Sequence, residues 1–131
     1  IESVTLTTRK PPLALKAAPY LKDMDLSEIK EERVVFSGTA EEAIKGFPAN
    51  INVAAILSLA GIGVQKTKVK IVADPKIDKN IHEIEIIGTS GRIFIRCENL
   101  PSPTNPKTSY LASLSAIALL KQIASSVKIG T

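Results

Sequence analysis

The sequence is poor in the residues that build several common kinds of site. Its 131 residues include one cysteine, one histidine and no tryptophan, and aromatic residues make up only 4% of the chain. A single cysteine excludes an internal disulfide framework and a multi-cysteine metal site, and a single histidine excludes a histidine-rich cluster, so no metal is expected. The scarcity of aromatic side chains argues against a stacking platform for single-stranded nucleic acid.

Long apolar runs and targeting signals are also missing. No run reaches the ~18–20 residues that cross a bilayer. No charged segment followed by an apolar one opens the chain, as a signal peptide would. The first residue is Ile1 and not methionine, so we expect a piece of a longer or processed protein.

What is present is the composition of an ordinary globular domain, and we expect residues 1–131 to form one domain. Apolar residues make up 44% of the chain and charged residues 23%. The net charge is +4, with −1 in residues 1–45 and +5 in residues 46–131. A basic half can serve nucleic acid or an anionic small substrate, or be a solvated surface. No run of Lys and Arg exceeds two residues, which disfavours nucleic acid.

Hydrophobic periodicity and turn residues predict an α+β fold. Thr39 and Glu42 have the spacing of a capping box at a helix start. The predicted strands are 2–9, 33–37, 67–73, 81–88 and 91–98, and the predicted helices are 13–22, 39–45, 50–62 and 109–124. This order favours a mixed, mostly antiparallel sheet with helices packed on one face.

The last three strands are expected to form a meander. Antiparallel pairing of the first two would place Lys68 and Lys70 beside Glu83 and Glu85, with Arg92 and Arg96 continuing the polar face. The other face is apolar, with Cys97 in it, and must meet helices or another subunit. The helix over 50–62 is apolar all round and is expected to be buried on most faces. The last helix has an expected core stripe of Leu111, Leu114, Ile117, Ala118 and Leu120.

His82 is the first candidate for chemistry. It shares its strand face with Ile84 and Ile86, where a lone histidine is more often a hydrogen-bonded core residue than a catalytic one. If it is functional, it is a general base or acid, because an imidazole pKa of ~6.5 suits proton transfer near neutrality.

Two further segments can bind a ligand. Asn50 and Asn52 stand at a helix start, where they can cap the helix or present amide groups and free N–H groups. The proline-rich loop from Glu98 leads into the start of the last helix, with Lys107 beside it, and a carboxylate or phosphate is stabilised at such an end. The alternative is a capped helix after a surface loop.

Four segments together resemble the catalytic domain of the L-aspartate dehydrogenase family. They are Thr8–Pro12 (TRKPP), Phe47–Gly63 (FPANINVAAILSLAGIG), Ala73–Gly88 (ADPKIDKNIHEIEIIG) and Glu98–Lys121 (ENLPSPTNPKTSYLASLSAIALLK). The resemblance implies the substrate half of a two-part enzyme, which also serves dimerisation. The dinucleotide-binding Rossmann half is absent from this chain, so the chain alone is expected to be inactive.

The resemblance also implies a reaction. It is the oxidative deamination of L-aspartate by NAD or NADP to iminoaspartate, then oxaloacetate and ammonia, in the cytoplasm and linked to NAD biosynthesis. His82 matches the catalytic position and Asn52 a cofactor-binding position, in a homodimer. For the substrate carboxylates our own expectation, from the helix-end argument, is a further set of polar residues: Asn50, Asn105, Lys107, Thr108, Ser109 and Lys10.

Other interpretations stay open. The chain can be the substrate domain of a related two-domain oxidoreductase, such as a dihydrodipicolinate-reductase-like enzyme, or a dimerisation domain without activity. The choice between NAD and NADP depends on ribose-reading residues outside this half.

Overall fold

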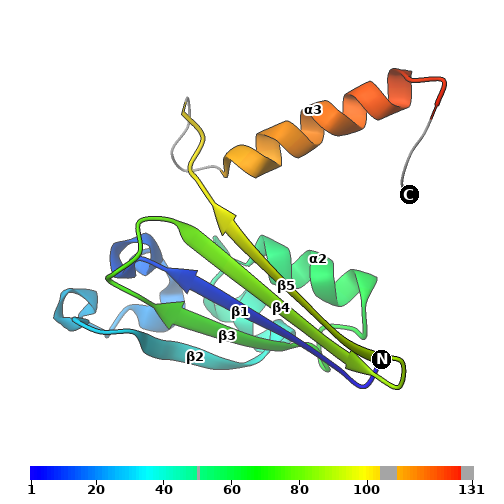
Figure 1. Ribbon diagram of the computed structural model, residues 1–131. Helices are drawn as coiled ribbons and strands as arrows, with labels where there is room; N and C mark the ends of the chain where they lie inside the picture. Colours follow the sequence, from blue (N-terminus) through cyan, green and yellow to red (C-terminus); the bar gives the residue numbers. More distant parts are fainter. Residues whose placement is uncertain (50, 104–108, 128–131) are drawn as a thin grey trace. The chain divides into compact units, whose positions relative to one another are not determined.

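The computed structural model describes residues 1–49, 51–103 and 109–127, and the chain divides into two compact units. The larger unit is Ile1–Glu98 and the smaller is Asn99–Thr131. The larger unit holds a five-stranded sheet in the order β2-β3-β1-β4-β5 (Figure 1). The strands are β1 Ser3–Lys10, β2 Arg33–Thr39, β3 Lys68–Ala73, β4 Asn80–Gly88 and β5 Gly91–Asn99.

The sheet is mixed, as predicted. β1 runs parallel to β3 and antiparallel to β4, and β2 is antiparallel to β3. Figure 1 shows β4 and β5 running in opposite directions as a hairpin. All five predicted strands form within one or two residues of their expected bounds, and the α+β prediction is confirmed.

The predicted meander is wrong in one connection. β1 lies between β3 and β4, so Thr5 has Lys68 as its register partner on one side and Glu85 on the other. The lysines of β3 are therefore not beside the glutamates of β4. The prediction assumed that strands adjacent in sequence pair with each other, but here the N-terminal strand separates two later ones. β4 and β5 pair as expected, since Arg92 contacts Glu85.

Helix α1, Ala40–Gly46, begins with the predicted capping box. The Thr39 hydroxyl accepts a hydrogen bond from the Glu42 amide, and the Glu42 carboxylate accepts one from the Thr39 amide at 2.7 Å. These two bonds satisfy backbone donors that a helix start leaves without partners. Phe47 follows the helix and is fully buried.

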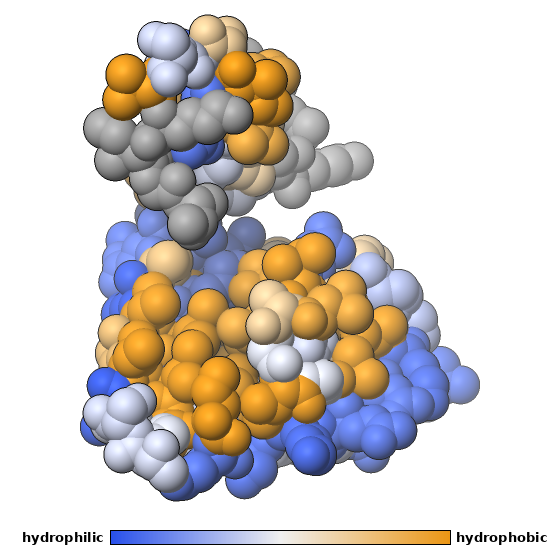
Figure 2. All heavy atoms as spheres, turned by 90° about the vertical axis from the view of Figure 1, so that its right-hand side faces the viewer, coloured by the Kyte–Doolittle hydropathy of each residue, from blue (hydrophilic) through white to orange (hydrophobic). Residues whose placement is uncertain are grey.

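Helix α2, Asn52–Ala60, packs one face on the sheet. Ala54 and Ser58 are its buried residues, whereas Ile56 and Leu59 are 67% and 78% exposed. The expectation of burial on most faces is wrong, because the sheet covers one side of the helix only. Figure 2 shows a broad apolar area on the larger unit.

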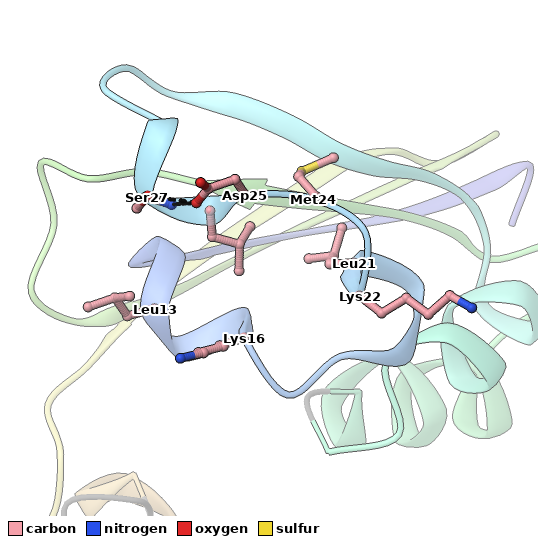
Figure 3. Close-up of a pocket in the computed structure, with 8 residues that line it drawn as sticks. Leu13, Lys16, Leu21, Lys22, Met24, Asp25 and Ser27 are labelled. Atoms are coloured by element: carbon pink, nitrogen blue, oxygen red, sulfur yellow. Dashed lines mark hydrogen bonds between the residues drawn. The ribbon is translucent and has the colours of Figure 1, made fainter.

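The predicted helix over 13–22 is replaced by 3-10 turns. They span Pro12–Leu15 and Pro19–Leu21, and a third, Leu26–Glu28, follows. Prolines at the starts of the first two turns break the hydrogen-bond ladder of a longer helix. Between the turns lies a surface hollow of about 390 Å³ (Figure 3). Its lining is Leu13, Lys16, Leu21, Lys22, Met24, Asp25, Leu26 and Ser27.

One hydrophobic core lies under the helix-covered face of the sheet. Leu6 of β1, Ile71 of β3 and Phe47 are each at most 1% exposed. Ile51 and Ala54 at the start of α2 belong to the same cluster, and Ile84 of β4 packs against it. This core holds α2 against β1, β3 and β4.

The smaller unit contains helix α3, Tyr110–Ala124, close to the predicted bounds. Ser109 occupies its N-cap position without a side-chain capping bond. The predicted core stripe is wrong, because Leu111, Leu114, Ile117, Ala118 and Leu120 are all exposed. The helix forms from its local sequence, but the smaller unit has no second described helix or sheet on which that stripe could pack.

Candidate functional site

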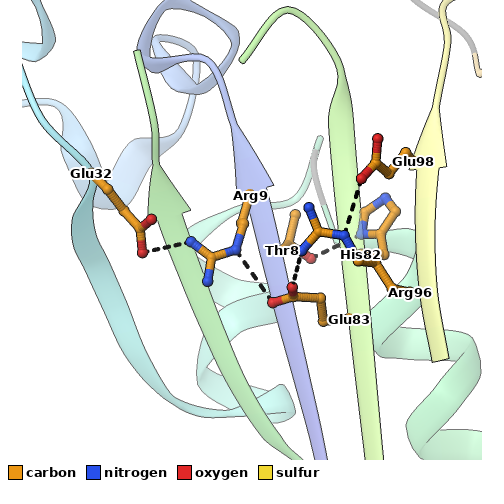
Figure 4. A network of polar contacts seen from close by, with 7 residues as sticks. All are labelled: Thr8, Arg9, Glu32, His82, Glu83, Arg96 and Glu98. Carbon is orange, nitrogen blue, oxygen red and sulfur yellow. Dashed lines mark hydrogen bonds and ion pairs between the residues drawn. The ribbon is translucent and has the colours of Figure 1, made fainter. Parts of the chain in front are cut away.

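His82 lies where β4 begins and faces the helix-covered side of the sheet. It is the register partner of Thr8 in β1, and two residues on, Ile84 opposes Leu6. The Thr8 hydroxyl oxygen and His82 Nδ1 are 3.1 Å apart, a hydrogen-bond distance (Figure 4). Thr8 is buried and the imidazole is half-buried. The ring therefore has one nitrogen held by the strand next to it.

The surroundings of this ring favour its neutral form. Burial lowers the pKa of His82, and the positive charge of Lys10 lowers it further. A charged imidazole loses hydration when it is half-buried, and a nearby cation repels it. Near neutral pH the ring is therefore available to accept a proton.

Lys10 ends β1 on the same face as Thr8, because residues two apart on a strand point the same way. Burial lowers its pKa as well. Its carbonyl oxygen accepts a hydrogen bond from the amide of Asp74 at 2.9 Å, which joins the ends of β1 and β3. A cation that has lost hydration at this end of the sheet is stabilised by an anion that comes close to it.

Helix α2 begins at the same end of the sheet. Residues 61–67 connect its last turn to the start of β3, and the amide of Gly63 reaches back to the carbonyl of Ser58 at 3.0 Å. Since β3 is parallel to β1, the first turn of α2 points toward the end of β1 and the start of β4 (Figure 1). Asn52 is the first residue of the helix and is exposed.

The described part of the larger unit contains only some of the predicted site residues. Ser109 belongs to the smaller unit, at the start of α3. Asn50, Asn105, Lys107 and Thr108 lie outside the described residues. The predicted site is therefore described for His82, Asn52 and Lys10 only.

The opposite face of the same strands carries an ion-pair network (Figure 4). Arg9 pairs with Glu32 and, at 3.3 Å, with Glu83, which in turn pairs with Arg96. Arg96 also contacts Glu98 at 3.1 Å. Hydrogen bonds that Arg9 donates to Glu32 first and to Glu83 next raise its pKa, and those that Arg96 donates to Glu98 and Glu83 raise the pKa of Arg96. The side chains of these pairs are between 15% and 51% exposed, and the pairs link β1, β4 and β5.

Two surface hollows of the larger unit lie away from His82. The hollow between the 3-10 turns, and a second of about 350 Å³ beside the β4–β5 turn, are not lined by His82. Among the residues that the structure describes, no three His, Cys, Asp or Glu side chains are grouped to hold a metal ion. Within the same residues, no helix combines the length and apolar character needed to span a membrane.

Thr8 is the member of this site that sequence reasoning missed. The TRKPP segment contains it, but the expected pairing of β4 with β3 gave it no partner. The sequence did contain a signal for Thr8. Thr8 lies two residues before Lys10 on one strand, so the two side chains share a face.

A family model described as the C-terminal part of aspartate dehydrogenase matches residues 1–123. The chain belongs to this aspartate dehydrogenase C-terminal family. It is 56% identical over its whole length to an L-aspartate dehydrogenase of Methanosarcina mazei, of which it covers 49%. It is 47% identical to another L-aspartate dehydrogenase, from Bradyrhizobium diazoefficiens, of which it covers 47%.

A solved structure agrees with this membership of the aspartate dehydrogenase C-terminal family. The crystal structure of aspartate dehydrogenase from Thermotoga maritima matches 98% of this chain with a TM-score of 0.72 and 35% identity. The match covers 47% of that chain. The chain thus spans about half the length of the curated relatives it matches.

Proposed function

We propose that the protein containing this chain oxidises L-aspartate with a pyridine nucleotide, and that this chain supplies the substrate half. The observation that carries the proposal is the neutral, half-buried His82 held by Thr8 beside the cationic Lys10, in a chain of this family. The proposed products are iminoaspartate, then oxaloacetate and ammonia. The link to NAD biosynthesis is part of the proposal because the family resemblance implies it.

Lys10 is the residue we propose for a substrate carboxylate. Its cation sits at the end of β1, where burial disfavours the charged form. A dicarboxylate offers a negative charge that offsets this cost. Asn50, Asn105, Lys107, Thr108 and Ser109 remain proposed contributors to substrate binding from the helix-end argument.

Asn52 is the residue we propose for the cofactor. At the start of α2 its exposed amide offers both a donor and an acceptor, and the first N–H groups of a helix have no partner within the helix itself. This donor set fits the carboxamide of a nicotinamide ring. A bound pyridine nucleotide supplies the oxidant, which accepts a hydride with its electron pair from the substrate Cα. The assay below compares NAD and NADP as the oxidant.

His82 then acts on water. After the Cα–H bond is broken, the substrate carries an imine carbon. A water oxygen bonds to that carbon while Nε2 of His82 takes one of its protons. The carbinolamine nitrogen takes the proton back from His82, and the C–N bond breaks to release ammonia. The hydroxyl proton leaves to solvent as the C=O bond of oxaloacetate forms. Lys10 holds the substrate in place during both steps.

The wider organisation of the protein is also a proposal. We propose that residues 1–131 act as one substrate and dimerisation part beside a dinucleotide-binding Rossmann part, in a cytoplasmic homodimer. A single cysteine suits a reducing compartment. The edge strand β5 leaves Ile93 and Ile95 exposed on one face and Phe94 on the other, which supports a subunit contact at this edge.

Light scattering tests the assembly. The expected mass is twice that of one subunit. Ile93→Asp should lower the mass if the contact lies on the Ile93 face of β5, and Phe94→Asp should lower it if the contact lies on the Phe94 face. A mass of one subunit in the unmodified protein would contradict the homodimer.

A substrate panel tests the reaction. The whole enzyme is assayed with L-aspartate, D-aspartate and L-malate, each with NAD and NADP, and with dihydrodipicolinate and each reduced nucleotide. Ammonia and the change in reduced nucleotide are both measured. We expect equal amounts of ammonia and reduced nucleotide from L-aspartate. Turnover of dihydrodipicolinate alone would support the reductase-like alternative, and no turnover at all would support a dimerisation domain.

Lys10→Met tests the carboxylate contact in the same assay, with Lys16→Met as the matched control on an exposed turn. The KM for aspartate is expected to rise about tenfold or more in the first variant, as loss of a charge-assisted hydrogen bond does. The KM for the nucleotide should stay the same in both. Equal effects on the two KM values would remove Lys10 from the aspartate site.

A further inference from the structure

Thr8 has no role in the reaction described so far, yet it is the buried neighbour of the reacting imidazole. Its exposed fraction is 3%, and its hydroxyl lies 3.1 Å from Nδ1 of His82. The two residues are direct register partners of β1 and β4, and Figure 4 shows their side chains meeting between the strands. Both strand segments pack on the core through Leu6 and Ile84. The contact is therefore fixed by backbone pairing.

Proton transfer by a neutral imidazole needs one ring nitrogen without a hydrogen. The hydrogen bond made by the other nitrogen selects which one that is. If Nδ1 carries the hydrogen and donates it to the threonine oxygen, Nε2 has the lone pair that accepts a proton from water. After that transfer the ring is charged, and Nδ1 still donates to the same oxygen. One acceptor thus serves the ring before and after the step.

Resting on the proposed function, we propose that Thr8 is a positioning residue: its hydroxyl oxygen accepts the Nδ1 hydrogen of His82 and so presents Nε2 as the base. Thr8 does not touch the substrate in this account. Its effect is on the orientation and the tautomer of the ring, and so on the rate of the step and not on substrate binding.

The position of Thr8 suits this role better than that of its neighbours. Thr7 and Arg9 point to the other face of the sheet, where Arg9 pairs with Glu83. Lys10 shares the face of Thr8, but as a cation it offers no acceptor to Nδ1–H. Among the residues that the structure describes, the Thr8 hydroxyl is the group shown within hydrogen-bond distance of this nitrogen.

Thr8→Val and Thr8→Ser form a matched pair for the test. Valine keeps the shape of threonine and removes the hydroxyl, whereas serine keeps the hydroxyl. In the whole enzyme, Thr8→Val is expected to lower kcat about 3- to 10-fold, the effect of one hydrogen bond. The KM for aspartate should remain within about twofold, and Thr8→Ser should restore most of kcat. Melting curves of both variants show whether the fold is retained.

Nitrogen-15 spectra of histidine-labelled enzyme give a readout that does not depend on activity. The His82 signals are those that disappear in His82→Gln. Unmodified enzyme should show a protonated Nδ1 and an unprotonated Nε2 above the pKa, and Thr8→Val should show a mixture of the two tautomers. A protonated Nε2 in the unmodified enzyme would overturn the proposal.

The two proposals fail in different ways. If His82→Gln retains the full kcat, the base assigned in the proposed function is wrong. If His82→Gln loses activity while Thr8→Val keeps both the full kcat and a single Nδ1–H tautomer, the reaction stands and Thr8 has no positioning role.

Discussion

The two faces of β1 and β4 are made of alternate residues of the same segments. The pKa values of their cationic groups are nevertheless shifted in opposite directions. On the helix-covered face, burial lowers the pKa of Lys10 and of His82. On the other face, hydrogen-bonded carboxylates raise the pKa of Arg9 and Arg96. The contrast follows from what each face meets, since one packs against a core and the other is bridged by ion pairs.

The proposed site lies on the helix-covered face. Exposed ion pairs of the other face contribute little to stability. On the helix-covered face, burial disfavours the charged forms of Lys10 and His82, and shifted pKa values of this kind are common at functional sites. We therefore propose that the substrate binds on this face.

Truncating a side chain on the helix-covered face should give the largest effect on stability. Leu6→Ala removes a side chain that is 1% exposed, and its free energy of unfolding should fall by about 2–5 kcal/mol. Thr7→Ala, the next residue and on the other face, should change it by less than about 1 kcal/mol. Urea titrations of the two variants measure the difference, and similar losses would mean that the two faces are equally packed.

The second-largest difference between the two faces is expected in the pH dependence of stability. Because the folded pKa of His82 lies below its unfolded value of 6.5, the unfolded chain binds the proton first as the pH falls through 6.5. The free energy of unfolding should therefore decrease with falling pH below that point. His82→Gln should show a shallower decrease between about pH 6.5 and 5. An unchanged slope would place the imidazole in a solvated environment.

Breaking the ion pairs should have the smallest effect. Arg96→Ala removes contacts to Glu83 and Glu98 at a half-exposed site. The expected loss is at most about 1 kcal/mol, and it should shrink as salt is added. A larger loss that is insensitive to salt would show that this face is buried, for instance by a second subunit.

Local signals in the sequence predicted most of the elements. The alternation of β-branched and polar residues located all five strands, and the Thr39–Glu42 pattern located the start of α1. The same alternation placed His82 on an apolar face. These features depend on residues within a few positions of one another, which is why a single sequence contains them.

Long-range pairing was not predicted. Nothing in the residues of β1 shows that it inserts between β3 and β4, and only that insertion brings Thr8 to His82. The burial of α2 and α3 was not predicted correctly for the same reason. The apolar positions of a helix do not show how much of it other elements cover. Pro19 lies inside the helix expected over 13–22, whereas in the structure Pro12 and Pro19 each begin a short 3-10 turn.

The most direct test of the account compares two adjacent residues of β4 that point to opposite faces. In the whole enzyme, kcat with L-aspartate is measured for His82→Gln and Glu83→Gln. The account predicts a loss of about 10²-fold or more for the first, a typical contribution of a general base, and a rate close to that of the unmodified enzyme for the second. A folded His82→Gln enzyme with full kcat, or equal losses in both variants, would contradict it.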